Sequence, residues 1–341
     1  MNLRKFLAIM LVSSVLAATY WGMRGDADSG PLETGLAVSA HSSALSGSAA
    51  LLPLPAVPPL PADKVELGRL LFFDRRLSRD DTIACASCHQ LDSGGSDRLL
   101  VSVGIDGRKG SINAPTVFNS SLNFVQFWDG RAASLEEQAA GPVHNPLEMG
   151  SNWAEVIAKL SRDEDYRQAF GQLYKQGITG ETIVDAIATF ERTLLTPNAP
   201  VDRFLAGDQK ALDPLERAGY QRFLDYGCAS CHQGAGIGGN MFQRFGVMDD
   251  YLKERANRQS DLGRFNVTGL DQDRNVFKVP SLRNVAVTPP YFHDGSAKTL
   301  DEAVIVMGRY QLGRELSEDD VKALVAFLRA LTGEWEGKRL Q

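Results

Sequence analysis

The feature that most constrains this chain is a five-residue motif that occurs twice and uses all four of its cysteines. The two copies are Cys85-Ala86-Ser87-Cys88-His89 and Cys228-Ala229-Ser230-Cys231-His232. The Cys-x-x-Cys-His pattern is the attachment site of c-type haem. Its two thiols bond one porphyrin, and the adjacent histidine becomes the proximal iron ligand. The sequence therefore predicts two covalently bound haem c groups.

Other uses of paired cysteines fit this pattern less well. Two structural disulfides would not require a histidine after each pair. The pairs are about 140 residues apart, whereas zinc ribbons space their pairs by about 15–20 residues. A thioredoxin-like site would need a βαβ setting, and no such pattern is found.

The N-terminus has the organisation of an export signal. Arg4 and Lys5 precede an apolar run, residues 6–18, which is shorter than the roughly 20 residues of a membrane-spanning helix. We interpret residues 1–24 as a signal peptide and the protein as periplasmic. The cleavage site is not distinct, so an uncleaved N-terminal membrane anchor stays an alternative.

Residues 25–61 lack hydrophobic periodicity and are rich in Ser, Ala and Pro. Such a composition is typical of a flexible linker that becomes polyproline-like at its end. His41 lies within this linker, and we assign it no role.

Composition limits the class of partner. The apolar fraction of 43% over 341 residues is sufficient for one large or two medium domains. The formal net charge is −6, and no basic stripe indicates nucleic-acid binding. An acidic surface would suit a basic or weakly charged redox partner.

The remaining patterns are almost entirely helical. Apolar side chains recur at helical spacing, for example at Ile183, Ile187, Phe190 and Leu194. Each haem motif lies among such segments, so we expect an all-α fold of two small haem domains. Helix-start signals occur at Asp63, Ser134, Asn152, Ser161, Asp213, Thr299 and Ser317.

Besides the two haem motifs, the chain contains a set of short motifs that occur together. They are Phe73-Asp74-x-Arg76-Leu77-Ser78, Asn113-Ala114-Pro115-Thr116, Phe127-Trp128-Asp129-Gly130-Arg131, Glu137-Gln138, Asn145-Pro146-x-Glu148-Met149, Pro280-Ser281-Leu282-Arg283-Asn284, Tyr291-Phe292-His293-Asp294-Gly295 and Gln311-Leu312-Gly313. In these motifs, from about residue 62 to its end, the sequence resembles the bacterial dihaem cytochrome c peroxidases.

This resemblance implies two cytochrome c-like domains packed together, with one calcium ion at their interface. The N-terminal, peroxide-reactive domain would cover residues 62–198 and be completed by the tail 335–341. The C-terminal, electron-accepting domain would cover residues 199–334.

The resemblance also implies roles for individual residues. His89 would be the proximal ligand of the first haem, and His232 and Met307 would ligate the second. From its position alone, Met307 could equally be a core residue. A thioether ligand raises the reduction potential of a haem.

Further roles concern catalysis and calcium. By resemblance, Glu148 and Gln138 would line the pocket above the first haem, and Trp128 would lie between the haems. Glu148 would transfer the peroxide proton as base and then acid. Without the flanking motifs, these three residues would be interpreted as structural. Calcium would be held by the Asn113 side chain and by the carbonyls of Thr288 and Pro290.

Two further histidines belong to this region. His144 precedes Glu148 by four residues and could approach the pocket, although a satisfied polar role is the stronger interpretation. His293 is expected to form a structural hydrogen bond near the second haem.

The sequence departs from the family at one position. Many members carry a histidine in the loop after the first haem motif that closes the peroxide-reactive iron in the oxidised state. The corresponding residue here is Ile105, and residues 90–127 contain no histidine or methionine. Lys109 is the one conceivable nitrogen ligand in this stretch, and a surface role suits it better. The first haem should therefore be constitutively open.

These features predict a cytochrome c peroxidase that reduces hydrogen peroxide with electrons from a small redox protein, either a cytochrome c or a cupredoxin. Two alternatives stay open: a dihaem oxidase of a protein or small-molecule substrate, and a pure electron-transfer cytochrome. The related enzymes that mature methylamine dehydrogenase carry a tyrosine where this chain has Met307, which favours peroxidase activity. A homodimer is also left open.

Overall fold

The computed structural model describes residues 50–253 and 258–341. The predicted signal peptide and the linker up to residue 49 lie outside the described residues. Within the described part, the fold is predominantly helical with short two-stranded sheets, which confirms the all-α expectation. No described helix is both long and apolar enough to cross a membrane.

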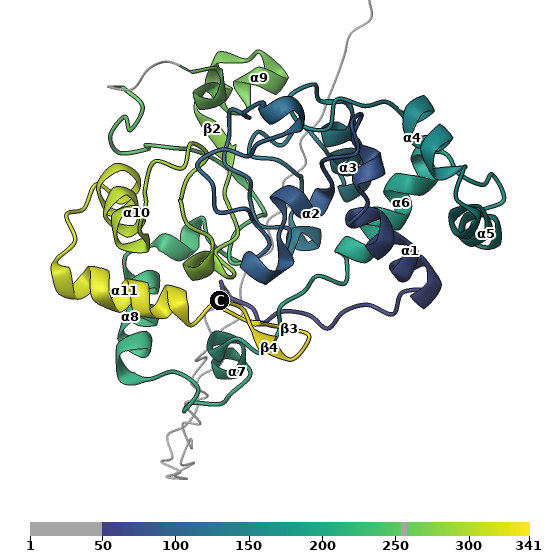
Figure 1. Cartoon of the computed structure of the whole chain (residues 1–341). Helices are drawn as coiled ribbons and strands as arrows, with labels where there is room; N and C mark the ends of the chain where they lie inside the picture. Colours follow the sequence, from purple (N-terminus) through teal and green to yellow (C-terminus); the bar gives the residue numbers. More distant parts are fainter. Residues whose placement is uncertain (1–49, 254–257) are drawn as a thin grey trace, which may run out of the picture. The chain divides into compact units, whose positions relative to one another are not determined.

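The helices that precede residue 200 gather on the right of Figure 1. They are α1 (Ala62–Phe72), α2 (Cys85–Cys88), α3 (Leu135–His144), α4 (Trp153–Leu160), α5 (Glu164–Leu173) and α6 (Gly180–Glu191). Helix α1 crosses α6 at close range, because a Cβ at Gly68 would lie 1.9 Å from the carbonyl oxygen of Ala186. Only glycine permits this approach.

The second half of the chain repeats this arrangement. Its helices are α7 (Pro200–Leu205), α8 (Pro214–Asp225), α9 (Phe265–Thr268), α10 (Leu300–Val306) and α11 (Glu318–Arg329). Helices α8 and α11 lie side by side (Figure 1). A Cβ at Gly219 would lie 1.9 Å from the carbonyl oxygen of Ala323. In both halves, a glycine on the helix before the haem motif thus contacts the last large helix.

The short strands form two antiparallel pairs. They are β1 (Phe242–Arg244) with β2 (Val276–Lys278), and β3 (Glu334–Trp335) with β4 (Lys338–Arg339). Phe242 lies opposite Lys278 in the first pair. The β1–β2 pair brings Lys278 close to Trp128, whose carbonyl accepts the Lys278 backbone N–H at 2.8 Å.

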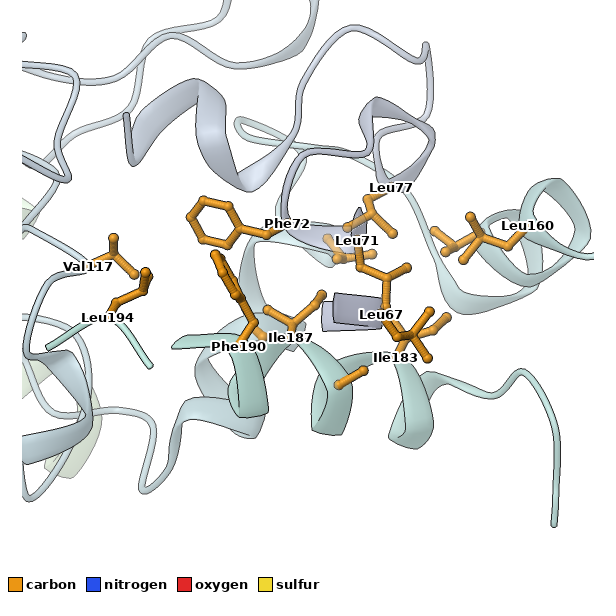
Figure 2. Close-up of a cluster of buried hydrophobic side chains, with 14 of the residues drawn as sticks. Leu67, Leu71, Phe72, Leu77, Val117, Leu160, Ile183, Ile187, Phe190 and Leu194 are labelled. Carbon is orange, nitrogen blue, oxygen red and sulfur yellow. The ribbon is translucent and has the colours of Figure 1, made fainter. Parts of the chain in front are cut away.

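Two hydrophobic clusters form the main cores. The first lies between α1 and α6 and includes Leu67, Leu71, Phe72, Ile187 and Phe190 (Figure 2). The second is built around Phe223 on α8 and Leu324 and Phe327 on α11. Burying the apolar faces of these helices supplies most of their stability, since isolated helices of this length are marginal in water.

Most predicted helix starts are confirmed. The side chains of Ser134, Asn152, Asp213, Thr299 and Ser317 each accept a hydrogen bond from a backbone N–H in the first helical turn. Two predicted starts are wrong. Helix α1 begins after Pro61 rather than at Asp63, and α5 begins after Asp163 rather than Ser161. In α5 the Asp163 carboxylate caps the Asp165 N–H.

The two ends of the described chain pack against these cores. The predicted flexible linker includes residues 50–54, yet Leu51 is buried in the second cluster. The Leu52 carbonyl accepts a hydrogen bond from Arg283, whose guanidinium also pairs with Asp202 at 2.7 Å. Leu51 and Leu52, near the end of the expected linker, thus contact the second core. At the other end, Leu340 is buried in the first cluster.

Candidate haem sites

Two cavities open beside the two cysteine motifs. The first, of about 570 Å³, is lined by Cys85, Cys88 and His89. The second, of about 410 Å³, is lined by Cys228, Cys231 and His232. Both volumes lie within the roughly 300–1,000 Å³ of cofactor pockets.

The histidines of both motifs suit iron ligation. Burial lowers the pKa of His89 and lowers that of His232 to about 4, so both imidazoles are neutral at pH 7. Neutral imidazole is the form that binds metal. The Nδ1 atom of His89 lies 3.4 Å from the Gly95 carbonyl. Because a carbonyl only accepts, this contact places the proton on Nδ1 and leaves the Nε2 lone pair free. The residues present therefore fit a c-type haem in each cavity.

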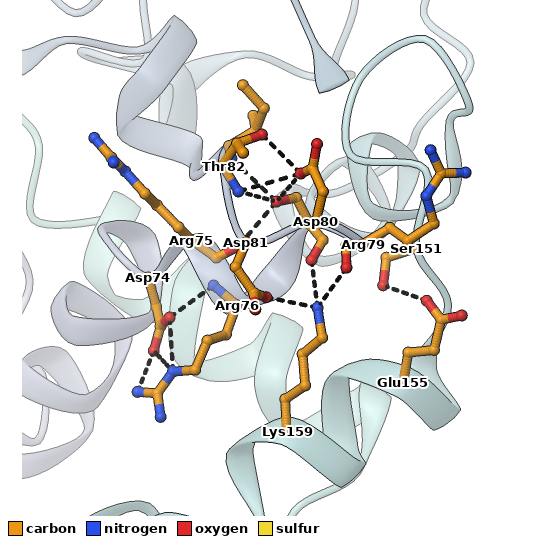
Figure 3. A network of polar contacts seen from close by, with 12 residues as sticks. Asp74, Arg75, Arg76, Arg79, Asp80, Asp81, Thr82, Ser151, Glu155 and Lys159 are labelled. Atoms are coloured by element: carbon orange, nitrogen blue, oxygen red, sulfur yellow. Dashed lines mark hydrogen bonds and ion pairs between the residues drawn. The ribbon is translucent and has the colours of Figure 1, made fainter. Parts of the chain in front are cut away.

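A polar network fixes the segment that leads into the first motif (Figure 3). Asp74 and Arg76 form an ion pair at 2.7 Å. From α4, the Lys159 ammonium donates to the Ser78 carbonyl at 2.7 Å and pairs with Asp81 at 2.6 Å. The Lys159 contacts attach residues 78–81, just before α2, to α4.

The predicted catalytic residues Glu148 and Gln138 both line the first cavity. Gln138 comes from α3 and Glu148 from the loop that follows it. The Asn145 side-chain amide donates to Glu148 Oε1 at 2.5 Å. Burial raises the pKa of the Glu148 carboxyl, and this effect outweighs the hydrogen bond and the charge of Arg131. The side chains of Gln138 and Glu148 thus line the same cavity as Cys88 and His89.

Ile105, the residue that corresponds to the family's loop histidine, does not face the first cavity. Its side chain is fully buried and does not line the cavity. A Cβ at Gly150 would lie 2.3 Å from Ile105 Cδ1, so this side chain fills the space that Gly150 leaves. Of residues 103–109, all described, Gly104 alone lines the first cavity.

Met307 lines the second cavity with His232. It is the first residue of a π-helical turn, Met307–Gln311, that continues α10. Turns of this kind occur often at functional sites. The structure therefore brings both predicted ligands of the second haem to one cavity.

Trp128 lines both cavities. Its indole Nε1–H donates to the Asn113 carbonyl at 3.0 Å, and the Asn113 side-chain amide donates to the Leu99 carbonyl at 2.7 Å. These two bonds fix the indole in the wall that the two cavities share.

The two additional histidines have structural contacts. His144 is exposed, packs edge-on against Trp153 at 5.2 Å and does not line either cavity. The approach of His144 to the pocket is therefore not observed. His293 is buried, lines the second cavity and contacts Asp261 through Nε2 at 2.9 Å. The predicted hydrogen-bonding role of His293 is confirmed.

The predicted calcium ligands share one region. Asn113, Thr288 and Pro290 all line the second cavity. The Asn113 amide nitrogen is engaged with Leu99, which leaves its oxygen as the acceptor. Among the described residues, no group of three or more His, Cys, Asp or Glu side chains could hold a metal.

Sequence reasoning missed two buried ionisable residues that line these cavities, Glu191 and Lys278. Glu191 follows Ile187 by four positions and shares its apolar helix face. Lys278 stands between Phe277 and Val279 in a short apolar run. A charged residue within an apolar pattern was the available signal in both cases.

Two cytochrome c-like units with one haem motif each define a dihaem c-type cytochrome. The family described as di-haem cytochrome c peroxidase matches residues 62–210, and the family described as cytochrome c matches residues 217–332. The chain is 51% identical over 282 residues to the cytochrome c peroxidase Ccp of Escherichia coli strain K12, covering 82% of this chain and 60% of that protein. The chain thus spans less than two thirds of the Escherichia coli protein.

Two other similar proteins are matched over more of their own length. A cytochrome c551 peroxidase of Nitrosomonas europaea is 46% identical, over 87% of this chain and 88% of that protein. The crystal structure of a MauG-like protein associated with microbial copper homeostasis is 30% identical with a TM-score of 0.74, covering 83% of this chain and 94% of that one. The chain belongs to the bacterial di-haem cytochrome c peroxidase family. Its fold, its two haem c groups and its enzyme class, cytochrome c peroxidase, are as predicted.

Proposed function

We propose that this protein reduces hydrogen peroxide to two molecules of water in the first cavity, with two protons and two electrons. The electrons would come one at a time from a small cytochrome c or cupredoxin, and the haem held by His232 would receive them. The haem groups supply the electron transfer and the iron at which peroxide reacts. His89 would hold the first haem, and His232 and Met307 would hold the second.

The observation that carries this proposal is the position of Glu148 in the same cavity as His89. Peroxide reduction needs a group that takes a proton from one oxygen and returns it to the other. A carboxyl whose pKa is raised toward the working pH exchanges protons most effectively. The Asn145 amide holds one Glu148 oxygen and so orients the other. Gln138 orients peroxide through its amide.

Electron transfer between the two sites is assigned to Trp128. This role is supported by its lining of both cavities and by its fixed indole. An aromatic ring held in the shared wall shortens the path that an electron must cross.

The first site is proposed to be open in the oxidised protein. Support comes from the loop 103–109, of which only Gly104, a residue without a side chain, lines the cavity. Ile105 carries no atom that ligates iron and is buried beside Gly150. No prior reduction is then needed to release a ligand.

The remaining assignments follow the family resemblance. A calcium ion is bound by Asn113, Thr288 and Pro290, and the protein works in the periplasm. The two haem domains cover residues 62–198 and 199–334. The tail 335–341 completes the first, which the packing of Trp335 against Phe118 supports.

Steady-state peroxide consumption with a reduced small cytochrome c or cupredoxin tests this function. We expect donor oxidation at two equivalents per peroxide. If no donor of either class supports turnover while the protein oxidises a protein or small organic substrate, the oxidase alternative is correct. Electron exchange without peroxide consumption would instead identify a pure electron carrier.

A further inference from the structure

Lys278 is a buried lysine in the wall between the two haem cavities. Lys278 is only 6% exposed. It lines both cavities, and among the described residues that do so it alone is charged. Its neighbours in this shared wall include Asn113, Trp128 and Phe277.

The described chain supplies no carboxylate partner for this ammonium. No described acidic residue forms an ion pair with Lys278 Nζ. Asp129 exerts some attraction on it, but the Asp129 carboxylate is bound by Arg131 at 3.0 Å. Burial lowers the pKa of Lys278 to about 8. An unpaired charge in this position costs free energy, so a bound anionic group is expected to compensate it.

Other cations that line the cavities are already engaged or exposed. The Arg283 guanidinium pairs with Asp202 at 2.7 Å. Arg131 pairs with Asp129 and lies over the Phe127 ring at 3.5 Å. Arg244 is exposed on β1. Lys278 is therefore the buried cation available to a ligand of either cavity.

Haem c is a ligand that carries such anionic groups. Its vinyl groups are consumed by the two cysteine thiols, but its two propionate side chains stay as carboxylates. We propose that Lys278 is the counter-ion of haem propionate at the junction of the two cavities, and that its charge raises the reduction potential of at least one haem. The ammonium opposes the negative charge that reduction adds, and so favours the reduced state.

The position of Lys278 is held through its backbone. Its N–H donates to the Trp128 carbonyl at 2.8 Å, and its strand pairs with β1. The same residue is thus attached to the proposed electron-transfer tryptophan and faces both haem sites. One charge in this place can adjust the driving force for electron transfer between the sites.

The test is a spectroelectrochemical titration of the holoprotein, with both haems counted by pyridine haemochrome assay. Lys278→Met removes the charge and keeps similar volume, whereas Lys278→Arg keeps the charge. Lys322→Met is the matched control, because it removes the same charge from a side chain that is 63% exposed on α11. Loss of a charge about 12 Å from an iron, in a medium of effective dielectric constant about 20, should change the reduction equilibrium by about tenfold, which is about 59 mV for one electron.

We expect Lys278→Met to lower at least one midpoint potential by this amount. The potentials of Lys278→Arg and Lys322→Met should stay close to those of the wild type. The proposal is overturned if Lys278→Met changes the reduction equilibrium constant of each haem by less than twofold. A shift in Lys278→Arg as large as that in Lys278→Met also overturns it, since packing rather than charge would then be responsible.

Failure of haem attachment is informative as well. If Lys278→Met and Lys278→Gln both lack a haem while Lys278→Arg retains two, the charge is required and the proposal holds. If all three variants lack a haem, the lysine acts through its shape and the proposal fails.

Discussion

The backbone N–H of Ile105 donates a hydrogen bond to the carbonyl oxygen of Glu148 at 2.9 Å. This bond joins the loop after the first haem motif to the loop that carries the proposed catalytic carboxyl. The Ile105 side chain, buried beside Gly150, completes the connection. Ile105, the residue that departs from the family pattern, thus helps to hold the loop that carries Glu148.

Truncating Ile105 should loosen this support. Ile105→Ala removes a fully buried side chain, and such changes typically cost about 2–5 kcal/mol, whereas Ile105→Val typically costs about 0.5–1.5 kcal/mol. We expect Ile105→Ala to lower the free energy of unfolding of the holoprotein, measured with guanidinium chloride, more than Ile105→Val does. We also expect a lower peroxide turnover in Ile105→Ala. Equal stability of Ile105→Ala and wild type would show that the contact contributes nothing.

Glu148→Gln should retain both haems and lose most peroxide turnover. A positioned proton-transfer group typically contributes about 10²–10⁴-fold, and glutamine keeps the shape without the proton. Glu181→Gln, on the exposed face of α6, is the control and should match the wild type. A rate for Glu148→Gln within a factor of about three of the wild type would remove Glu148 from the proposed mechanism.

Met307→His should lower the reduction potential of the second haem, because imidazole stabilises ferric iron relative to a thioether. A redox titration followed in the visible spectrum measures this shift. Met248→His provides the control, since Met248 is 61% exposed. No decrease in the higher potential would mean that Met307 does not ligate iron.

Glu191 should make folding stability depend on pH. Burial raises the pKa of its carboxyl from 4.5 to about 8, and its Oε2 has no hydrogen-bond partner in the described structure. Between pH 4.5 and 8 the unfolded chain loses a proton that the folded chain keeps, so stability falls as pH rises through this window.

Glu191→Gln should remove this loss. The stability of the variant relative to the wild type should increase between pH 5 and pH 8, by at most about 1.36 kcal/mol for each pH unit. Unfolding curves at several pH values provide the measurement, with Glu181→Gln as a control on the same helix. A difference that is constant over this range would contradict the assignment.

The two haem-attachment sites could be predicted because the spacing of the cysteines and the histidine alone defines them. Cys85, Cys88 and His89 must meet one porphyrin wherever the chain folds. Helix starts at Ser134 and Asn152 were predictable because the capping contact is local. The start of α1 was not, since Pro61 begins the helix without a side-chain cap.

The direction of Ile105 and the burial of Lys278 could not be predicted in the same way. Both depend on contacts between segments far apart in sequence. Ile105 enters the space beside Gly150 only after the two loops are brought together, and Lys278 becomes buried only when β2 pairs with β1 and meets Trp128. The apolar run around Lys278 was a signal of burial, but the sequence pattern does not identify the distant segments that Ile105 and Lys278 contact.

Rapid mixing of the all-ferric holoprotein with hydrogen peroxide tests the central claim most directly. With Ile105 buried and no ligand from residues 103–109 in the first cavity, we predict a change in the haem absorption spectrum within the mixing experiment, without any electron donor. The same mixing with Glu148→Gln should give a slower change. A wild-type spectrum that stays unchanged until a reductant is added would contradict the open site.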